Sequence, residues 1–458
     1  MEGDNMRVVG IDTGVTSKHC AVVVDSEGTK DSKPILFGTS IQEYDRMIEE
    51  ANKGGKTDIF AIETAGEAWY TLALHLHKKG YQVAIVSPEK SHDFRKSLRK
   101  HTKTNRIDAS SIARSLIIDR TSITYFSPRT TKIEALRRLT RRYTSLQKEQ
   151  AAHRTIIRAE LRSLLPSWRQ PEGIFTMPYK KWFKKGVDPW YWNETNKAEL
   201  QELLKDPVET ERIIEACEQT RKIYSNIHQE GLDSGVLAVQ QEVAILELLE
   251  DQIKELKRKI SQIYRELDED RVLTSICGIG EFTAAVILGE VGDITRFRNN
   301  AGFSSYCGVV PKRNDTGDTH RQGQKMTKQG NRHLRRVLFL AALSGTRTDP
   351  ELATIYYRQK EVLKKHHNKA MGFVMNALAR RIYAVLKRNP HLFSGGKGEK
   401  APYIIKIEGI TVDKKVAREW IEKNKKTTSK KNGSRAGKYP PETVKDVSRI
   451  SNGLPLIV

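Results

Sequence analysis

The sequence predicts an α/β domain at the N-terminus, paired long helices in the middle and a mostly α-helical domain toward the C-terminus. Three observations lead to this prediction. Short runs rich in β-branched residues alternate with helical segments over the first quarter of the chain. Apolar residues then recur at intervals of three and four in two long segments, and a basic region of helices and glycine-containing turns follows.

The first domain, residues 1–128, is expected to order its elements β-β-β-α-β-α-β. Short apolar runs bounded by Gly, Asp or Lys predict the strands, at residues 7–12, 20–25, 34–38, 58–63 and 82–87. The intervals "IQEYDRMIEEANKG" and "EAWYTLALHLHKKG" have helical spacing. This is the order of a ribonuclease-H-like domain, in which the first and fourth strands lie side by side. Ligands of open α/β sheets bind at the carboxyl ends of such strands.

Acidic residues end the two strands that are expected to be neighbours. Asp12 ends the first strand and Glu63 ends the fourth, so both acids are predicted at one edge of the sheet. Asn105 and Asp108 lie three residues apart at the start of a later helix and share a helix face. Asp12 alone would be interpreted as a strand-end residue. Clustered carboxylates need a cation, however, and four hard oxygen ligands together predict a Mg²⁺ site that acts on phosphate.

An excess of basic residues predicts a polyanionic partner. Lys plus Arg number 79 and Asp plus Glu 56, and the net charge of +23 favours nucleic acid over a membrane surface. The stretch from Phe94 to Ile107, which includes Lys103 and Arg106, is basic without any acid. Next to a metal cluster it is interpreted as a track for phosphates, with an ordinary solvated face as the alternative.

The sequence does not predict a membrane protein or a secreted one. It has no apolar run long enough to span a bilayer, and no signal peptide opens the chain. The four cysteines are scattered, without the spacing of a zinc site. These features favour a reducing cytoplasm.

Two long helices, over residues 129–165 and 236–268, are predicted to form a coiled coil. The second has gaps of three and four through three heptads, at Leu246, Leu249, Ile253, Leu256, Ile260, Ile263 and Leu267. The spacing leaves open whether the helices pair within one chain or bridge two chains; we expect this seam to join chains. Between the helices, residues 166–235 contain "PYKKWFKKGVDPWYWNE", which is either a set of base-stacking aromatics or a small packed insertion.

Residues 269–395 form the expected C-terminal domain. "VLTSICGIGEFTAAVILGEV" is predicted to be a helix-hairpin-helix, in which Gly278 and Gly280 let backbone amides approach a DNA phosphate. A basic, glycine-containing loop follows and leads into another helix. The candidate phosphate ligands there are Lys312, Arg313, Arg321, Lys325, Lys328, Arg332, Arg335 and Arg336. The tail, residues 396–458, is rich in Lys, Ser and Gly and is predicted to be disordered.

Several motifs resemble the IS110 transposases, a family with a DEDD, RuvC-like domain that also includes the Piv-type DNA invertases. "GIDTGVTSKHCAVVV", "IETAGEAW" and "KTNRIDASSIA" are similar to motifs of that domain. The stretch from "LTSICGIGEF" to "NRHLRRVL" is similar to the C-terminal transposase domain of the family. The resemblance covers roughly residues 7–165 and 245–390.

This resemblance implies a site-specific DNA recombinase of an insertion sequence. In the family, four acids bind Mg²⁺, and a serine of the second domain attacks DNA and becomes covalently linked to it. The resemblance also implies a bridge-type guide RNA that pairs with the element ends and with target DNA. It further implies dimers or tetramers with sites composed across subunits, in the bacterial or archaeal cytoplasm at the nucleoid.

Two positions depart from the family pattern. The third acid falls on Asn105, and the serine falls on Thr316 of "NDTG". Threonine is a competent nucleophile in principle, but its methyl group crowds the attack. We therefore expect a weak but real recombinase. The alternatives are a non-catalytic nucleic-acid-binding relative and a RuvC-like junction nuclease that uses water and forms no protein–DNA bond.

Overall fold

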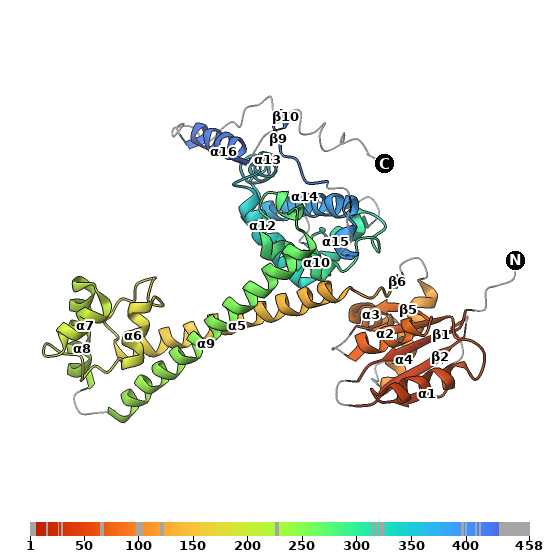
Figure 1. Cartoon of the computed structure of the whole chain (residues 1–458), viewed down its shortest axis with the longest axis horizontal. Coiled ribbons are helices and arrows are strands. Elements are labelled where there is room, and N and C mark those ends of the chain that lie inside the picture. The colour runs from red at the N-terminus through yellow and green to blue at the C-terminus, as the bar shows by residue number, and fades with distance from the viewer. Residues whose placement is uncertain are drawn as a thin grey trace. The chain divides into compact units, whose positions relative to one another are not determined.

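In the computed structural model the chain forms two compact units, Met1–Arg129 and Thr130–Val458, and each is described by itself (Figure 1). The structure describes residues 6–14, 17–25, 27–28, 31–64, 68–97, 104–119, 123–224, 229–312, 315–316, 319–320, 326–394, 398, 401–407, 410–411 and 414–429. Among these residues no helix is both long enough and apolar enough to cross a bilayer.

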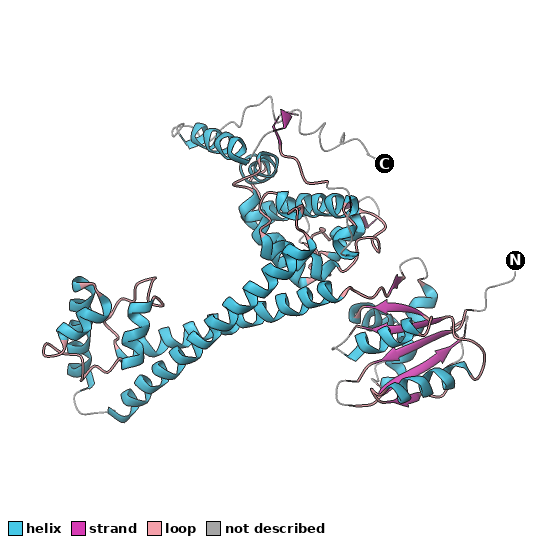
Figure 2. Cartoon of the chain, viewed as in Figure 1, coloured by secondary structure: helices cyan, strands magenta, loops and turns pink. Residues whose placement is uncertain are grey.

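A six-stranded sheet in the order β3-β2-β1-β4-β5-β6 forms the centre of the first unit (Figure 2). Its strands are β1 (Val8–Asp12), β2 (His19–Val24), β3 (Ile35–Phe37), β4 (Ile59–Glu63), β5 (Gln82–Val86) and β6 (Thr124–Tyr125). β1 runs antiparallel to β2 and parallel to β4. The prediction that the first and fourth strands lie side by side is therefore confirmed.

Helices cover both faces of this sheet. α1 (Ile41–Asn52) and α2 (Ala68–Lys78) bury their apolar sides on one face. α4 (Asn105–Ile118) packs on the other face and also contacts α3 (Pro88–Ser97). The two faces take alternate residues of each strand, as the period of two requires.

The backbone of α4 lies directly against β1 because Gly10 has no side chain. A Cβ at Gly10 would lie 2.0 Å from the carbonyl oxygen of Ala109 and 2.8 Å from the amide nitrogen of Ala113. No real Cβ tolerates such distances, so any larger residue would push the helix away from the sheet.

The first turn of α4 lies over the carboxyl ends of the strands. Near the other end of the helix, Arg114 donates a 2.9 Å hydrogen bond to Asp31, which lies at the amino end of β1. In the first turn, Arg106 acts electrostatically on Cys20, which pairs with Asp12 at the carboxyl end. α4 therefore runs antiparallel to β1.

In the second unit, α5 (Thr131–Leu164) and α9 (Gln229–Leu267) form an antiparallel pair within one chain. Polar contacts that join them along their length are Lys132–Glu266, Arg154–Glu250 and His153–Glu242. The apolar seam of α9 is buried at Leu246, Ile260 and Leu267 in clusters that include α5 residues. Within this structure α5 of the same chain covers the seam at these residues, and our expectation that the seam joins chains stays a prediction.

The insertion between these helices is a small packed domain. It contains α6 (Met177–Lys185), α7 (Lys197–Leu204) and α8 (Pro207–Tyr224), which share one core with the end of α5 and the start of α9. Trp182, Phe183 and Trp192 are fully buried there. The packed insertion is thus the correct alternative for these three side chains, which have no face left to stack on bases.

The C-terminal domain builds one helical core on the start of α5 and the end of α9. Its elements are η2 (Leu273–Ser275), α10 (Glu281–Val291), α11 (Asn300–Tyr306), α12 (Arg332–Gly345), α13 (Pro350–Tyr357), η3 (Arg358–Val362), α14 (His367–Arg388) and α15 (His391–Ser394). The single 3-10 turn η2 stands where the first helix of a helix-hairpin-helix was expected, so that motif is not confirmed.

Part of the predicted disordered tail is folded, which corrects the prediction. β9 (Lys406–Ile407), β10 (Ile410–Thr411) and α16 (Lys414–Ser429) lie within it. Ala417 and Ile421 of α16 are fully buried, and the amide of Tyr403 donates a 2.8 Å hydrogen bond to Ser275. The apolar residues among the lysines were sufficient to dock a helix. Residues 430–458 lie outside the described part of the chain.

The contact at Gly10 predicts a specific sensitivity to added volume. Gly10→Ala should lower the free energy of unfolding of the first unit by about 1–3 kcal/mol, because the new methyl group overlaps the backbone of α4. Gly231→Ala is the matched control: it lies in α9 with open space around its Cα, so the exchange should stabilise the helix by about 1 kcal/mol. Thermal unfolding of both full-length variants, followed by circular dichroism, measures the difference. Equal stability of Gly10→Ala and the parent would contradict the packing argument.

Candidate functional site

Two of the predicted acids meet at the carboxyl edge of the sheet. β1 and β4 pair in parallel with Ile11 opposite Ile62, so the next residues, Asp12 and Glu63, follow at the same level. Gly10 and Ala61, two residues earlier on each strand, face α4. Because side chains alternate along a strand, both acids lie on the face that α4 covers. Both are partly exposed.

The other two predicted ligands lie in the first turn of α4, which is the end nearest to these acids. The Thr104 side chain caps this helix by accepting a hydrogen bond from the amide of Ile107. Asn105 is exposed and lies four residues before the Ala109 that contacts β1, and Asp108 is partly exposed and lies one residue before it. The helix dipole also favours negative charge at this end.

Arg95 of α3 is a site residue that the sequence did not single out. Its Nη1 donates a 2.6 Å hydrogen bond to Oδ1 of Asp108, and both side chains are largely buried. The guanidinium supplies the positive charge that Asp108 needs in this environment. Only the basic character of the stretch around Arg95 was visible in the sequence.

The acids also act electrostatically on their surroundings. Burial and, secondarily, the negative charge of Asp12 raise the pKa of the Cys20 thiol to about 11, against a smaller lowering by Arg106. Cys20 is therefore a protonated, unreactive neighbour of the acids at neutral pH.

The donor set suits Mg²⁺, but the described residues do not enclose an ion. Three carboxylates and an amide oxygen are the hard ligands that magnesium prefers. Within the described residues, however, no three His, Cys, Asp or Glu side chains are grouped so that they could hold a metal. Oδ1 of Asp108 is bound by Arg95, so this guanidinium competes with any ion for the carboxylate.

In the second unit, Thr316 lies in a short β-ribbon. β7 (Asp315–Thr316) pairs antiparallel with β8 (Thr319–His320), and Thr316 is opposite Thr319 in the innermost pair. Below the ribbon, an isolated bridge joins Pro311 to Met326. The bridge and the ribbon therefore mark one hairpin, and Thr316 lies at the end that is farther from the bridge.

The predicted phosphate ligands fall into three groups. Five of them are exposed. Four lie around the base of this hairpin and on the first turns of α12: Lys312, Lys328, Arg332 and Arg336. The fifth, Arg106, belongs to α4 of the first unit. Arg335 is partly buried and donates a 2.7 Å hydrogen bond to the carbonyl oxygen of Lys328, a structural role. Lys103, Arg313, Arg321 and Lys325 lie outside the described residues.

The two glycines of the expected phosphate-binding turn differ from each other. Gly278, at φ +90°, packs against α12, where a Cβ would lie 2.2 Å from the carbonyl oxygen of Ala341. Its conformation and missing side chain serve this helix contact. Gly280 precedes α10, is exposed and has open space around its Cα. Of the two glycines, only Gly280 thus offers an open helix N-terminus.

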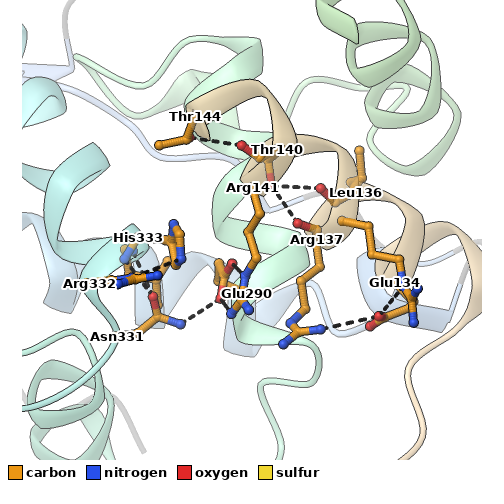
Figure 3. Close-up of polar contacts among 12 residues, drawn as sticks. Glu134, Leu136, Arg137, Thr140, Arg141, Thr144, Glu290, Asn331, Arg332 and His333 are labelled. Atoms are coloured by element: carbon orange, nitrogen blue, oxygen red, sulfur yellow. Dashed lines mark hydrogen bonds and ion pairs between the residues drawn. The ribbon is translucent and has the colours of Figure 1, made fainter. Parts of the chain in front are cut away.

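A buried polar network near the hairpin was missed in the sequence. Glu290 of α10 accepts hydrogen bonds from Arg141 of α5 and from Asn331, the N-cap of α12 (Figure 3). The available signal was Glu290 itself, a single acid inside the apolar run "FTAAVILGEV". A charge in such a run is buried and requires a partner.

Comparison with known proteins agrees with both parts of the chain. A family model described as a transposase, of the DEDD IS110 type, matches residues 9–166. A second, described as "Transposase IS116/IS110/IS902 family", matches residues 270–357. Together the two models cover more than half of the chain, and they occur in the order that the resemblance predicted.

Individual relatives carry the same kind of name. The transposase for insertion sequence element IS1328 of Yersinia enterocolitica is 24% identical over 71% of this chain and 83% of its own length. The IS110 43.6 kDa protein of Streptomyces coelicolor is 36% identical over 26% of this chain and 30% of its own length. A probable family 20 transposase of Pseudomonas aeruginosa is 26% identical over 31% of this chain and 45% of its own. The chain thus matches less than half the length of the last two, and on the two family models it belongs to the IS110 family of transposases.

Proposed function

We propose that this protein is a DNA transposase that cuts and rejoins DNA with Mg²⁺ and the hydroxyl group of Thr316. The observation that carries the proposal is the convergence of Asp12 and Glu63 at the ends of adjacent parallel strands, under the first turn of α4. Family membership supports the reaction class, since the matching models and the Yersinia relative are named transposases.

In this proposal Asp12, Glu63 and Asp108 hold the metal, and Asn105 adds a neutral oxygen. Magnesium bound there supplies Lewis-acid stabilisation of the charge that develops on a DNA phosphate. Arg95 would share the Asp108 carboxylate with the ion, and its positive charge would compete with the ion for this ligand. Asn105 brings one negative charge fewer than the family's acid, so the ion is held more loosely and remains more electrophilic.

Thr316 is the proposed nucleophile. Its hydroxyl oxygen forms a bond to phosphorus, the bond between phosphorus and one DNA oxygen breaks, and that oxygen leaves with the proton that the threonine hydroxyl gives up. Asp315 is the candidate base that takes the threonine proton. The exposed cations around the hairpin, Lys312, Lys328 and Arg332, support binding of the phosphate backbone next to this step.

The nucleic-acid partners in this proposal are the element ends, the target DNA and a bridge-type guide RNA. The net charge of +23 supports a large polyanionic interface. A groove at the junction of α5 and α9 adds to this support: its lining contains five cations, Lys132, Lys254, Lys257, Arg258 and Arg265, against two acids, Glu266 and Glu269. A dimer or tetramer is also part of this proposal, and nucleic acid shared between chains is one way to join them.

The metal proposal predicts a selective loss of chemistry. Asp12→Ala should lower the rate of DNA cleavage by at least about a hundredfold, because metal stabilisation is worth several kcal/mol, with DNA binding nearly intact. The assay combines cleavage of labelled element-end DNA, with RNA and Mg²⁺, and a gel shift for binding. Asp58→Asn is the control, an acid just before β4 at the opposite end of the strand. Undiminished cleavage by Asp12→Ala would remove the metal site from the proposal.

The ion pair between Arg95 and Asp108 predicts competition with the metal. Arg95→Ala should lower the Mg²⁺ concentration for half-maximal cleavage several-fold, since a cation that shares the carboxylate is removed. Lys96→Ala removes the same charge from an exposed neighbour and should leave the midpoint unchanged. A Mg²⁺ titration of the cleavage rate measures both midpoints. An increase in the midpoint for Arg95→Ala would mean that Arg95 supports the metal site instead.

The nucleophile predicts a covalent intermediate. Thr316→Ser should form a protein–DNA adduct at least as fast as the parent because the crowding methyl group is gone, and Thr316→Ala should form none. Denaturing electrophoresis with labelled DNA, Mg²⁺ and the cognate RNA detects the adduct. An adduct that survives Thr316→Ala assigns the nucleophile elsewhere. If neither the parent nor the serine variant forms one, the non-catalytic relative becomes the better description.

A further inference from the structure

We propose that Glu290 is a positioning residue, which with Asn331 and Arg141 fixes the base of the hairpin that carries Thr316. The inference rests on the proposed function, in which Thr316 attacks DNA. It assigns no catalytic contact to Glu290 and concerns only where the hairpin is held.

Glu290 is a buried carboxylate with a complete set of partners. It is 1% exposed, and Arg141 donates to its two oxygens from Nε and Nη2 at 2.6 and 2.8 Å. Nδ2 of Asn331 donates a third hydrogen bond, at 2.7 Å. Burial raises the pKa of Glu290, but these partners outweigh it and hold the pKa below its usual range. The carboxylate is therefore ionised, and the bidentate contact with the planar guanidinium of Arg141 fixes its orientation.

Asn331 links this carboxylate to the start of α12. Its Oδ1 accepts hydrogen bonds from the amides of His333 and Leu334, at 2.9 and 3.1 Å, and so caps the helix. The same side chain uses its amide group on Glu290. Figure 3 shows Glu290 between Arg141 and Asn331, which come from different helices. A single side chain thus fixes both the direction of α12 and its distance from α10.

The other chain segment that leads into the hairpin, which begins at the end of α11, contacts the backbone of Glu290. The hydroxyl of Tyr306 donates a 2.9 Å hydrogen bond to the backbone carbonyl of Glu290, and the amide of Asn331 donates to the carbonyl of Tyr306 at 2.7 Å. Between these points and the hairpin, the amide of Thr327 donates to the carbonyl of Val310 at 2.9 Å. Both chain segments that enter the hairpin are therefore hydrogen-bonded to Glu290, one to its side chain through Asn331 and the other to its backbone through Tyr306.

Apolar side chains in place of the whole network could pack the same space. Replacing a buried ion pair by well-packed apolar groups is often neutral or stabilising, so a buried charge is weak evidence for stability. Its distinctive property is directional: three hydrogen bonds define one arrangement of α5, α10 and α12. A nucleophile requires such precision, since a displacement of about 1 Å costs about a hundredfold in rate.

The chain offers a polarity-swap test. Asn331→Asp keeps the cap of α12 but places a carboxylate against Glu290. Glu290→Gln keeps an acceptor for Asn331 but weakens the fork with Arg141. The double variant Glu290→Gln with Asn331→Asp reverses donor and acceptor and restores the net charge of the network. At saturating DNA, Asn331→Asp should form the adduct about ten- to a hundredfold more slowly, with unchanged DNA affinity, and the double variant should recover most of this loss.

Asp349→Asn is the matched control. Asp349 is a buried acid of the same unit that caps α13 and accepts a 2.8 Å hydrogen bond from Arg381, without contact to the hairpin base. It should lower the melting temperature as the network variants do, but leave the adduct rate of the folded protein unchanged. If the network variants slow the adduct no more than Asp349→Asn does, or if the double variant is slower than both single ones, Glu290 is structural only.

Amide hydrogen exchange separates this inference from the proposed function. Protection of the Thr327 and Asn331 amides should fall in Asn331→Asp, recover in the double variant and persist in Asp349→Asn. If the parent forms no adduct, the proposed function fails, and the exchange pattern still decides whether the network holds the hairpin. Unchanged protection in all variants would overturn the inference even if the parent is active.

Discussion

The acidic site depends on the missing side chain of Gly10. Only glycine lets the backbone of α4 rest on β1, with the Ala109 carbonyl where a Cβ would otherwise stand. The first turn of the helix thereby reaches the carboxyl ends of β1 and β4, where Asp12 and Glu63 emerge. A helix separated from the sheet by ordinary side chains would hold its own acid some ångströms farther out. The distance between the strand-end acids and the first turn of α4, the two halves of the candidate site, is therefore set by a residue that carries no chemistry.

In the second unit, too, a single residue fixes how helices are placed, but there it acts through hydrogen bonds. α10 is almost wholly apolar and buried, so its position is dominated by nondirectional packing. Glu290 adds direction through hydrogen bonds to α5 and α12. The hairpin base thus combines apolar burial, which tolerates several orientations, with hydrogen bonds that allow only one.

Local patterns were sufficient to predict the strands and the acids that end them. Alternation and β-branched residues mark β1 and β4, and the position of Asp12 and Glu63 at their ends follows from the chain alone. The partner of Asp108 could not be predicted in this way, because Arg95 lies on another helix and its choice of carboxylate is tertiary. Whether the described residues assemble a metal centre depends on where their side chains lie, and the spacing of residues in the sequence does not determine this.

Periodicity also left open which partner covers a surface. The heptads of α9 describe an apolar stripe correctly, and α5 of the same chain covers it at Leu246, Ile260 and Leu267, which the spacing alone did not decide. The aromatic insertion was equally ambiguous until Trp182 and Trp192 proved to be fully buried. In the tail, a high lysine content obscured the few apolar residues that dock α16, Ala417 and Ile421. Composition averages over a segment, whereas folding depends on where its apolar residues fall.

The antiparallel pair of α5 and α9 has a mechanical consequence. Its helices share one core with the C-terminal domain at one end and another core with α6–α8 at the other. With 34 residues in α5 and a rise of 1.5 Å per residue, the pair is a strut about 50 Å long. Inserting one heptad in each helix would lengthen it by about 10 Å with nearly the same faces paired. The strut thus acts as a ruler whose length evolution can change in steps, without rebuilding the domain at either end.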